Sequence, residues 1–532
     1  MANERDPKGA PQGNCVDYLF ERALRPENRN RVFLRLDDGA VTFDQQYRRV
    51  CQVGHYLKAI GLKPGERMLM AVMDGPDFVA LFLGAMKVGV VVIPLSTYQN
   101  PKDYLHNLND SAAAALFVDH SLVGAIDQIR PQAKSCRFWG VLGGKAPGYE
   151  AFEPAVAGLP EELETRACGA DEIAYWQYSS GSTGAPKGVL HTHAHLYWAT
   201  ELGGIGTLGI HRDDVITCPP KMFFAFGLGG EIYFPLRVAA ETLVSATPIT
   251  PKRVWEQWIK NRPTVSMAVP TLYNGMLQYA EKELGQEVAR QACARMRFVL
   301  SAGEILPPSL MHRWKDYTGI ECLDGVGTTE MTHVFLMNRP GHPIEQSCGR
   351  ISDGYRYEIL DSEGKPVKKG ETGNLHVYGP SAATQYWNNP EKTKQVMGRG
   401  GVLTGDMVYE DNEGNLYMVG RSDDMLRVGA IWVSPAEVEG SLVTHAAVLE
   451  AAVIGAADAE GLTKPMAYVT LREPAQHPDR KALEAELQAH VHKTLPSFKV
   501  PRKIAFMDEL PKTATGKIQR FRLRGLAAGS GS

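Results

Sequence analysis

The sequence lacks the patterns that mark several common classes of protein. Its eight cysteines, spread over 532 residues, form no C-x-x-C pair of the kind that binds zinc or carries redox chemistry. Scattered single cysteines are typical of reduced thiols, so we expect a cytoplasmic protein. Lysine and arginine together number 57, and aspartate and glutamate 60, which leaves a formal net charge of −3. Such a chain has no broad positive field to hold nucleic acid or an anionic membrane surface.

Long hydrophobic runs are also missing. The most apolar stretch, Phe78–Leu95, is interrupted by Lys87 and two glycines, whereas a membrane-spanning helix needs about 20 apolar residues with few or no charges. We predict instead a buried helix over Phe78–Lys87, followed by a buried strand over Val88–Pro94. The first residues, MANERDPKGAPQGN, are polar and show no pattern of a secretory signal.

Helix and strand patterns alternate over most of the chain. The strands we predict include Arg67–Val72, Ala113–Val118, Val265–Pro270 and Arg297–Ser301, with helical patterns between them. This alternation is typical of α/β layers built on parallel sheets.

The pattern changes beyond Arg350, where the predicted strands are short and joined by Gly, Asp and Asn turns, and α/β character returns from Val433. The polar segment Gly420–Asp424 between these regions predicts a linker or hinge. We therefore expect an α/β fold with two domains. Residues 1–422 form a large composite N-terminal domain of two α/β sheet subdomains plus a small β subdomain, and residues 423–532 form a small mobile α+β C-terminal domain.

One loop is unusually rich in groups that bind phosphate. Tyr178–Gly188, YSSGSTGAPKG, follows an apolar strand pattern and holds three glycines, four serine and threonine hydroxyls and Lys187. Glycines let the backbone approach a ligand closely, and exposed N–H and O–H groups cradle phosphate oxygens. It is not a Walker A loop, because Gly188, rather than Ser or Thr, follows the lysine. On these residues alone, a surface hairpin remains an alternative.

Two other patterns imitate known sites. Gly204–Gly209 fits G-x-G-x-x-G, but a dinucleotide-binding loop follows a strand, and the preceding residues His195–Leu202 have a helical pattern. His191, His193 and His195 alternate as metal ligands on a strand would, but no cysteine or carboxylate stands close beside them, so we do not expect zinc.

The loop SSGSTGAPKG resembles the phosphate loop of the acyl-adenylate-forming superfamily, which includes acyl-CoA and aryl-CoA synthetases, peptide-synthetase adenylation domains and luciferases. Other motifs of that family follow in its order. They are Ser301-Ala302-Gly303-Glu304, Gly327-Thr328-Thr329-Glu330, Thr404-Gly405-Asp406, Gly420–Asp424 and Pro511–Arg520. Singly these are ordinary turns, and only the ordered set carries the resemblance. The stretches Lys221–Gly230 and Glu330–Leu336 most resemble benzoate- and hydroxybenzoate-CoA ligases. The resemblance places the three histidines at the start of a helix.

The resemblance implies a two-step reaction. A carboxylate attacks the α-phosphate of ATP to give acyl-AMP and pyrophosphate, and the thiol of coenzyme A then displaces AMP. ATP, Mg²⁺ and coenzyme A are the implied cofactor and co-substrates, and a small aryl carboxylate is the implied substrate. We expect no nucleic-acid or membrane partner and either a monomer or a homodimer.

The resemblance also assigns roles in the adenylation site. The implied catalytic residues are Lys517, Glu330, Thr183 and Phe224. Glu330 holds Mg²⁺, Asp406 accepts both ribose hydroxyls, and Lys517 bridges the α-phosphate and the carboxylate. The implied ATP- and AMP-binding residues are Ser179, Ser180, Gly181, Ser182, Thr183, Gly184, Lys187, Ser301, Ala302, Gly303, Glu304, Asp324, Gly325, Val326, Gly327, Thr328, Thr329, Asp406, Arg421 and Lys517.

The remaining roles concern the acyl group, coenzyme A and domain rotation. The implied acyl-site residues are Ala225, Phe226, Val326, Thr332, His333 and Val334, and those for coenzyme A are Arg427, Gly429, Ala430, Phe498 and Lys499. Asp423 is the implied hinge. On composition alone, the aromatic run around Phe226 favours buried core over an acyl site. A contact of His333 with the substrate and a purely structural histidine both remain open.

The chain departs from the family pattern at two positions. Relatives usually carry glycine where Ala430 stands, beside the pantetheine path, and many carry an aromatic residue where Val326 stands. The alternatives to an aryl-CoA ligase are a ligase for another cyclic or short aliphatic acid, a stand-alone adenylation enzyme, and a non-catalytic acyl-adenylate binder.

Replacing Lys517 by alanine tests the assignment of the two half-reactions. The Lys517→Ala variant should lose acyl-AMP formation, because no positive charge would bridge the two anions, yet still convert supplied acyl-AMP and coenzyme A into thioester. Pyrophosphate release and thioester formation are measured separately. An equal loss in both steps would contradict the assignment.

The methyl group at position 430 gives a second test. Ala430→Gly should leave pyrophosphate release unchanged and leave the thioester step equal or faster, because the pantetheine path would widen. A slower second step in single-turnover measurements would show that residue 430 lies elsewhere.

Overall fold

The computed structural model describes residues 13–179, 186–428, 431–458, 462–512 and 518–529. These residues pack into two compact units. One takes the described residues within 13–179, 186–357 and 376–404, and the other takes those within 358–375 and 405–529. The boundary that the sequence predicts between residues 422 and 423 stays a prediction.

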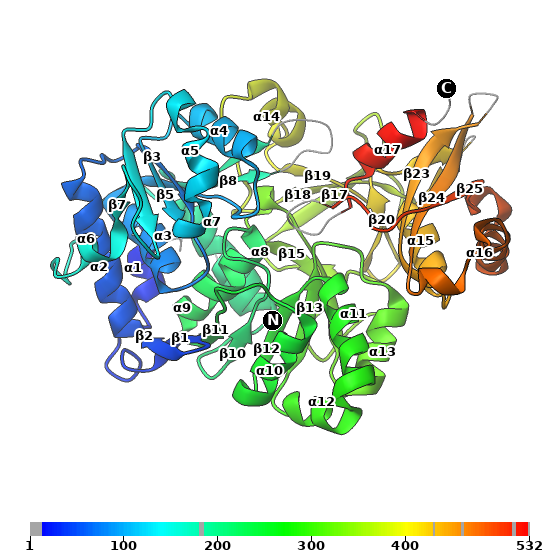
Figure 1. Cartoon of the computed structure of the whole chain (residues 1–532), viewed down its shortest axis with the longest axis horizontal. Helices are drawn as coiled ribbons and strands as arrows, with labels where there is room; N and C mark the ends of the chain where they lie inside the picture. The colour runs from blue at the N-terminus through cyan, green and yellow to red at the C-terminus, as the bar shows by residue number, and fades with distance from the viewer. Residues whose placement is uncertain (1–12, 180–185, 429–430, 459–461, 513–517, 530–532) are drawn as a thin grey trace. The chain divides into compact units, whose positions relative to one another are not determined.

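The first unit contains a seven-stranded sheet (Figure 1). Its strands in sheet order are β7 (Glu150–Ala151), β6 (Phe138–Leu142), β5 (Ala115–Asp119), β3 (Arg67–Ala71), β4 (Val91–Pro94), β8 (Ile173–Ser179) and β9 (Lys187–Thr192). Neighbouring strands run parallel except β8 and β9, which form an antiparallel pair at one edge.

A nine-stranded sheet forms the rest of the framework of this unit. Its strands in order are β16 (Arg350–Ile351), β15 (Val334–Met337), β14 (Cys322–Gly327), β13 (Phe298–Ala302), β12 (Val265–Ala268), β10 (Val215–Thr217), β11 (Glu241–Leu243), β1 (Val32–Leu36) and β2 (Gly39–Thr42). The strands between β14 and β1 run parallel, and the outer ones turn antiparallel. Both sheets are therefore mixed, and the expected parallel arrangement holds for their centres.

Alternating side chains divide each sheet between two hydrophobic layers. In β3, Met68 and Met70 join the core that both sheets share, whereas Leu69 joins the cluster on the opposite face with α4 (Pro101–Asp110). In β13, Leu300 joins the shared core, and Val299 faces the helices on the other side. This two-residue period is what a sheet covered on both faces requires.

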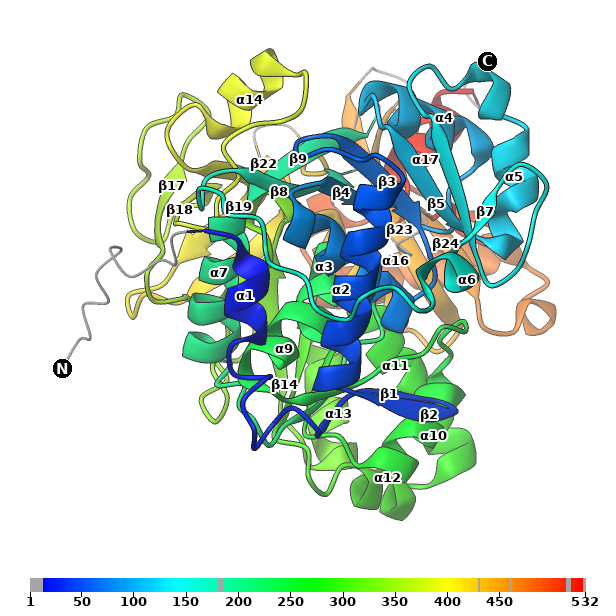
Figure 2. The ribbon, with the colours of Figure 1, turned by 90° about the vertical axis from the view of Figure 1, so that its left-hand side faces the viewer.

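Two helices fill the shared core. Figure 2 shows α2 (Phe43–Ala59) beside α3 (Pro76–Val88). Every residue of α3 from Phe78 to Val88 is buried, which explains the most apolar run in the chain. The buried helix and strand predicted there are confirmed, although the strand starts later, at Val91. The buried Lys87 ammonium donates to the Thr165 hydroxyl at 2.5 Å.

Helices also cover the outer face of the nine-stranded sheet. The helices α10 (Pro251–Asn261), α11 (Pro270–Tyr279), α12 (Gln286–Ala292) and α13 (Pro308–Thr318) gather there (Figure 1). The other α-helices of this unit are α1 (Cys15–Phe20), α5 (Val123–Asp127), α6 (Phe152–Val156), α7 (His193–Trp198), α8 (Ala225–Leu228), α9 (Phe234–Val238) and α14 (Pro390–Met397).

The histidine pattern divides between two elements. His191 lies on β9, whereas His193 and His195 begin α7, so the expected start of a helix is right for two of the three. Gly204–Gly209 follows a helix and begins inside the π-helical segment Ala199–Thr207, as its pattern predicts. Among the described residues, no group of three or more His, Cys, Asp or Glu could hold a metal ion. No helix formed by the described residues is long and apolar enough to cross a membrane.

The second unit contains a three-stranded sheet of β23 (Val448–Ala457), β24 (Thr463–Leu471) and β25 (Lys503–Phe506). Val453 faces a core with α15 (Pro435–Val443) and α16 (Arg480–Thr494), and Ile454 faces Leu523 of α17 (Arg520–Gly529). A hairpin pairs β21 (Leu426–Val428) with β22 (Ile431–Val433). A separate four-stranded sheet has the order β17 (Arg356–Leu360), β18 (Gly373–Tyr378), β19 (Val402–Glu410) and β20 (Leu416–Arg421).

Candidate active site

The ends of the predicted phosphate loop are held by a hairpin. Ser179 ends β8 and Lys187 begins β9, and the two residues pair across the strands. The surface hairpin and the phosphate loop, which the sequence left as alternatives, therefore do not exclude each other, because β8 and β9 are the two strands of a hairpin that flanks the predicted loop. Ser180, Gly181, Ser182, Thr183 and Gly184 lie outside the described residues.

A distant segment pairs with β9 along its other side. The backbone N–H of Leu190 donates to the carbonyl of Gln385 at 3.3 Å, and that of Trp387 donates to the carbonyl of Gly188 at 2.8 Å. Tyr386 lies between them, and its ring centroid is 6.0 Å from the Lys187 ammonium. The strand that carries Lys187 is thus fixed on both sides.

Glu330 is the carboxylate predicted to hold Mg²⁺. It lies in the short 3-10 turn Thr329–Met331 that follows β14. Its Oε1 accepts a hydrogen bond from the Tyr386 hydroxyl at 2.8 Å and a longer one from the Ser179 hydroxyl at 3.5 Å. Mg²⁺ is commonly held by one or two carboxylates together with substrate phosphates and water. One half-buried carboxylate beside the phosphate-loop strand fits that requirement.

The turn around Glu330 is braced by buried polar groups. Thr332 adopts φ 72°, unusual for a β-branched residue. Its hydroxyl donates to the carbonyl of Ser381 at 2.8 Å and accepts from His191 Nδ1 at 3.2 Å. The Ser381 hydroxyl in turn donates to the carbonyl of Met331 at 2.9 Å. Thr332, predicted to line the acyl site, thus has its hydroxyl engaged in the bracing.

The predicted adenine-side residues share one edge of the nine-stranded sheet. Ser301 pairs in register with Asp324, and Ala302 pairs with Gly325. Parallel strands deliver their following loops to the same edge, where ligands bind in open α/β sheets. Glu304 follows, and its carboxylate accepts from the Thr271 hydroxyl at 2.9 Å. The residues brought to this edge are Ser301, Ala302, Gly303, Glu304, Asp324, Gly325, Val326, Gly327, Thr328 and Thr329.

Asp324 is buried at this edge. Burial raises the pKa of its carboxyl to about 7, although the Cys348 thiol and the Gly325 N–H both donate to it. The carboxyl therefore changes charge near neutral pH.

Phe224, predicted as catalytic, and the predicted acyl-site residues Ala225 and Phe226 lie on one tight loop. Ala225 and Phe226 begin α8, and Phe224 precedes it. The Phe224 and Phe226 side chains are half-buried. The Phe224 ring lies edge-on to Phe223 with centroids 4.5 Å apart, and the Phe226 ring lies 5.4 Å from that of His333.

His333 is a buried, neutral side chain beside these rings. Burial lowers its pKa to about 4, so the imidazole is uncharged at neutral pH. Its Nε2–H donates to the carbonyl of Phe226 at 3.2 Å, and among the described atoms its Nδ1 has no hydrogen-bond partner. A side chain at Gly229 would place its Cβ 2.3 Å from the ring, so glycine is required there. Val334 begins β15 directly after His333 and is buried.

The second unit carries the predicted ribose-binding pair. Asp406 on β19 and Arg421 on β20 are cross-strand partners, and a guanidinium nitrogen of Arg421 lies 2.6 Å from the Asp406 carboxylate. The Asp406 side chain is 4% exposed and that of Arg421 50%. The pair thus combines a buried carboxylate acceptor, Asp406, with a half-exposed cation, Arg421.

The structure places some of the other residues predicted in this unit and leaves the rest outside the described residues. Arg427 lies on β21, and Phe498 and Lys499 lie in the 3-10 turn Ser497–Lys499. The Lys499 ammonium is paired with Glu437 at 2.6 Å. The backbone carbonyl of Asp423 accepts from Arg524 at 3.2 Å. Gly429, Ala430 and Lys517 lie outside the described residues.

Several residues of the site escaped the sequence motifs. Tyr386 and Ser381 hold the Glu330 turn from a segment outside the motifs named in the sequence analysis. His191 was visible as part of the histidine pattern, but its role depends on its distant partner Thr332.

The fold is mixed α/β, and the Glu330 carboxylate lies beside Ser179, the strand residue that leads into the glycine-rich, hydroxyl-bearing sequence. Such a combination is typical of proteins that bind nucleotide phosphates. Residues 20–387 match the model of the AMP-binding enzyme family, and residues 437–517 match that of the AMP-binding enzyme C-terminal domain. The chain belongs to the AMP-binding enzyme family, and the predicted superfamily is confirmed.

Individual relatives extend this result. A benzoate–CoA ligase of Thauera aromatica is 40% identical over 513 residues, which cover 96% of this chain and 95% of the relative. The crystal structure of an anthranilate CoA ligase in complex with anthranoyl-AMP matches with a TM-score of 0.91 and 37% identity, covering 98% of both chains. A benzoate CoA ligase from Burkholderia xenovorans LB400 matches with a TM-score of 0.86 and 38% identity, covering 96% of this chain and 99% of that one. These matches confirm the predicted fold class.

The buried Asp324 carboxyl predicts a pH-dependent contribution to stability. Its pKa is about 7 in the folded protein and about 3.9 when unfolded, so the folded state binds the proton more tightly. Stability should therefore fall as pH rises from about 4 to about 7, by at most about 4 kcal/mol from this group. Asp324→Asn should flatten that dependence, measured as thermal midpoints between pH 5 and pH 8. Parallel curves for the variant and the wild type would contradict the prediction.

Proposed function

We propose that this protein is an ATP-dependent aryl-CoA ligase that acts on benzoate or a hydroxybenzoate. It forms an aryl-AMP and pyrophosphate, and then aryl-CoA and AMP. Support comes from the benzoate–CoA ligase that is 40% identical over nearly the whole chain, and from the match to a ligase holding an aryl adenylate. Aryl carboxylate, ATP and coenzyme A are its small-molecule partners.

The arrangement around His333 carries the aromatic preference. Phe224 and Phe226 are half-buried beside it, and the imidazole is neutral. An amino-acid substrate would need a carboxylate for its ammonium group, whereas Ala225, Phe226, Val326, His333 and Val334 supply no charge. The Nδ1 of His333 is an acceptor suited to a ring hydroxyl.

In the first step, two anions must meet, so the site has to neutralise charge. Lys187 and the hydroxyls of the phosphate loop bind the phosphates, and Glu330 holds Mg²⁺, which neutralises phosphate charge when bound. Thr329 adds a hydroxyl to the phosphates. Lys517 bridges the α-phosphate and the carboxylate.

The nucleotide sugar is held by residues of the second unit. Asp406 accepts the ribose hydroxyls, and Arg421 supports the ribose or phosphate. The C-terminal domain, residues 423–532, rotates at Asp423 between the two half-reactions. Arg427, Gly429, Ala430, Phe498 and Lys499 then serve coenzyme A, and Lys499 first has to leave Glu437 if it is to bind a phosphate.

We further propose that the protein acts in the cytoplasm as a monomer or a homodimer. Gel filtration with light scattering measures the second part. A larger assembly would exclude it.

The direct test of function is release of AMP that depends on coenzyme A, measured with aryl, alicyclic and aliphatic acids. Benzoate or a hydroxybenzoate should give the highest kcat/KM. A higher value for an aliphatic acid would favour the alternative acyl-CoA ligase. Pyrophosphate release without any thioester would favour a stand-alone adenylation enzyme.

Phe226→Tyr tests the aryl pocket. The new hydroxyl changes one wall of the pocket, and such a change shifts selectivity by about 1–3 kcal/mol, or roughly tenfold to two-hundredfold. The ratio of kcat/KM values for benzoate and ring-substituted benzoates should change. Phe521→Tyr is the matched control, because Phe521 is 55% exposed on α17. An unchanged ratio for Phe226→Tyr would remove this residue from the pocket.

A further inference from the structure

A buried ion pair lies beneath the loop that carries the aromatic residues. The Lys221 ammonium is 3.1 Å from the Asp74 carboxylate, and the two residues are 8% and 5% exposed. The ammonium also donates to the backbone carbonyl of Ser245 at 2.9 Å. Asp74 lies outside the motifs that carry the family resemblance, and Lys221 begins the stretch Lys221–Gly230, in which the resemblance assigns it no role.

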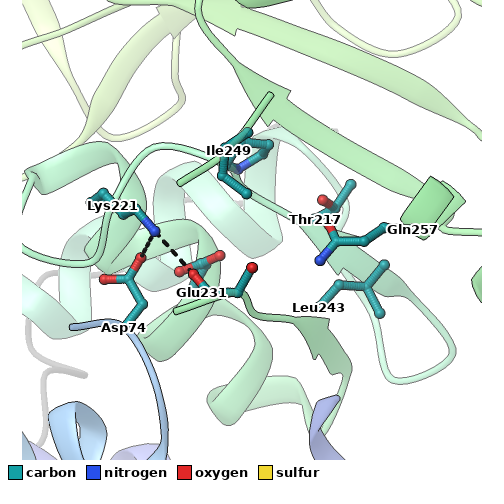
Figure 3. A pocket seen from close by; sticks show the side chains of 9 residues that line it. Asp74, Thr217, Lys221, Glu231, Leu243, Ile249 and Gln257 are labelled. Carbon is teal, nitrogen blue, oxygen red and sulfur yellow. Dashed lines mark hydrogen bonds and ion pairs between the residues drawn. The ribbon is translucent and has the colours of Figure 1, made fainter. Parts of the chain in front are cut away.

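The pair gathers segments from both large sheets. Asp74 follows β3 of the seven-stranded sheet, and Ser245 follows β11 of the nine-stranded sheet. Figure 3 shows Lys221 pointing toward Asp74, with Glu231 facing the same small cavity. Burial and the nearby Asp74 charge raise the pKa of Glu231 well above its usual value. Burial also raises the pKa of Asp74, whereas Lys221 lowers it, and Asp74 is the carboxylate that pairs with Lys221 at 3.1 Å.

The same carboxylate reaches the backbone of the aromatic loop. The second oxygen of Asp74 accepts from the N–H of Met222 at 3.1 Å. The loop then folds back on itself, because the N–H of Phe224 donates to the carbonyl of Lys221 at 2.9 Å. A Cβ at Gly227 would lie 2.2 Å from the carbonyl oxygen of Lys221, so the turn has no room for a side chain at this position.

Two further side chains hold the loop from other elements. Gln177 of β8 donates to the carbonyl of Phe223 at 3.0 Å, and His333 donates to that of Phe226 at 3.2 Å. The loop has little regular structure of its own, so these bonds to its backbone set where its aromatic rings lie. The contribution of charged side chains to this attachment comes from the Asp74–Lys221 ion pair and the bond from Met222 to Asp74.

We propose that Asp74 and Lys221 are positioning residues that set the shape of the aryl pocket through the loop Pro219–Gly227, and so determine which ring-substituted acids are accepted. This inference rests on the proposed function, because the selected group is the ring of its carboxylate substrate. Small displacements of positioning groups change rates strongly.

A second buried ion pair provides a matched control. Asp214 precedes β10, its side chain is 0% exposed, and Arg297 pairs with it at 2.9 Å. Asp214 therefore lies just before β10, whereas Lys221 lies beyond the other end of that strand. Loss of a buried charge partner destabilises both sites, but only one of them lies under the aromatic loop.

The experiment compares Asp74→Asn and Lys221→Met with Asp214→Asn and the wild-type chain. Steady-state constants are measured for benzoate, three ring-substituted benzoates and ATP, together with thermal midpoints. Asp74→Asn and Lys221→Met should raise KM for benzoate about tenfold and reorder the acids, with KM for ATP within about twofold of wild type. Asp214→Asn should lower the thermal midpoint and keep the order of the acids.

The double variant Asp74→Asn/Lys221→Gln keeps the comparison possible if a single variant does not fold, because it leaves no unpaired buried charge. It should still reorder the acids. An unchanged order in the folded variants would overturn the inference while leaving the aryl-CoA ligase activity intact. A wild-type chain inactive on every aryl acid would instead overturn the proposed function.

Discussion

The pairing of β13 with β14 is the constraint on which the first half of the site depends. Its register sets Ser301 opposite Asp324 and Ala302 opposite Gly325. Because the strands are parallel, the loops that leave them begin side by side. A slip by one residue would turn the buried Asp324 to the other face of the sheet. The packing of this sheet therefore determines the position of groups that resemble a nucleotide site.

The loops beyond the sheet edges are held in a consistent way. A buried side chain from one segment bonds to the backbone of another, as Asp74 does to Met222, Gln177 to Phe223 and His333 to Phe226. Buried backbone groups need partners, and side chains supply them where no strand or helix can. Such a loop is stiff without being regular, which suits a pocket wall.

The sequence predicted most of this framework because its signals are local. Apolar runs marked β3, β13 and α3, and the ordered motifs marked the segments after β13 and β14, which carry Glu304 and Glu330. The parts it missed depend on partners that are distant in the chain. Asp74 and Met222 are 148 positions apart, and Tyr386 reaches Glu330 across 56. Only the sheet topology decides which of these meet. The sequence did not predict the antiparallel strands at the sheet edges for the same reason. The residues of an edge strand do not show whether it runs parallel or antiparallel to its neighbour.

The segment around Tyr386 has an effect beyond the site. Since β9 ends the seven-stranded sheet, its outer N–H and C=O groups would otherwise form a template for the strand of another molecule, a common start of aggregation. Bonds from Leu190 to Gln385 and from Trp387 to Gly188 occupy part of that template. The segment that steadies Glu330 through Tyr386 thus also covers part of an edge that other strands could otherwise join.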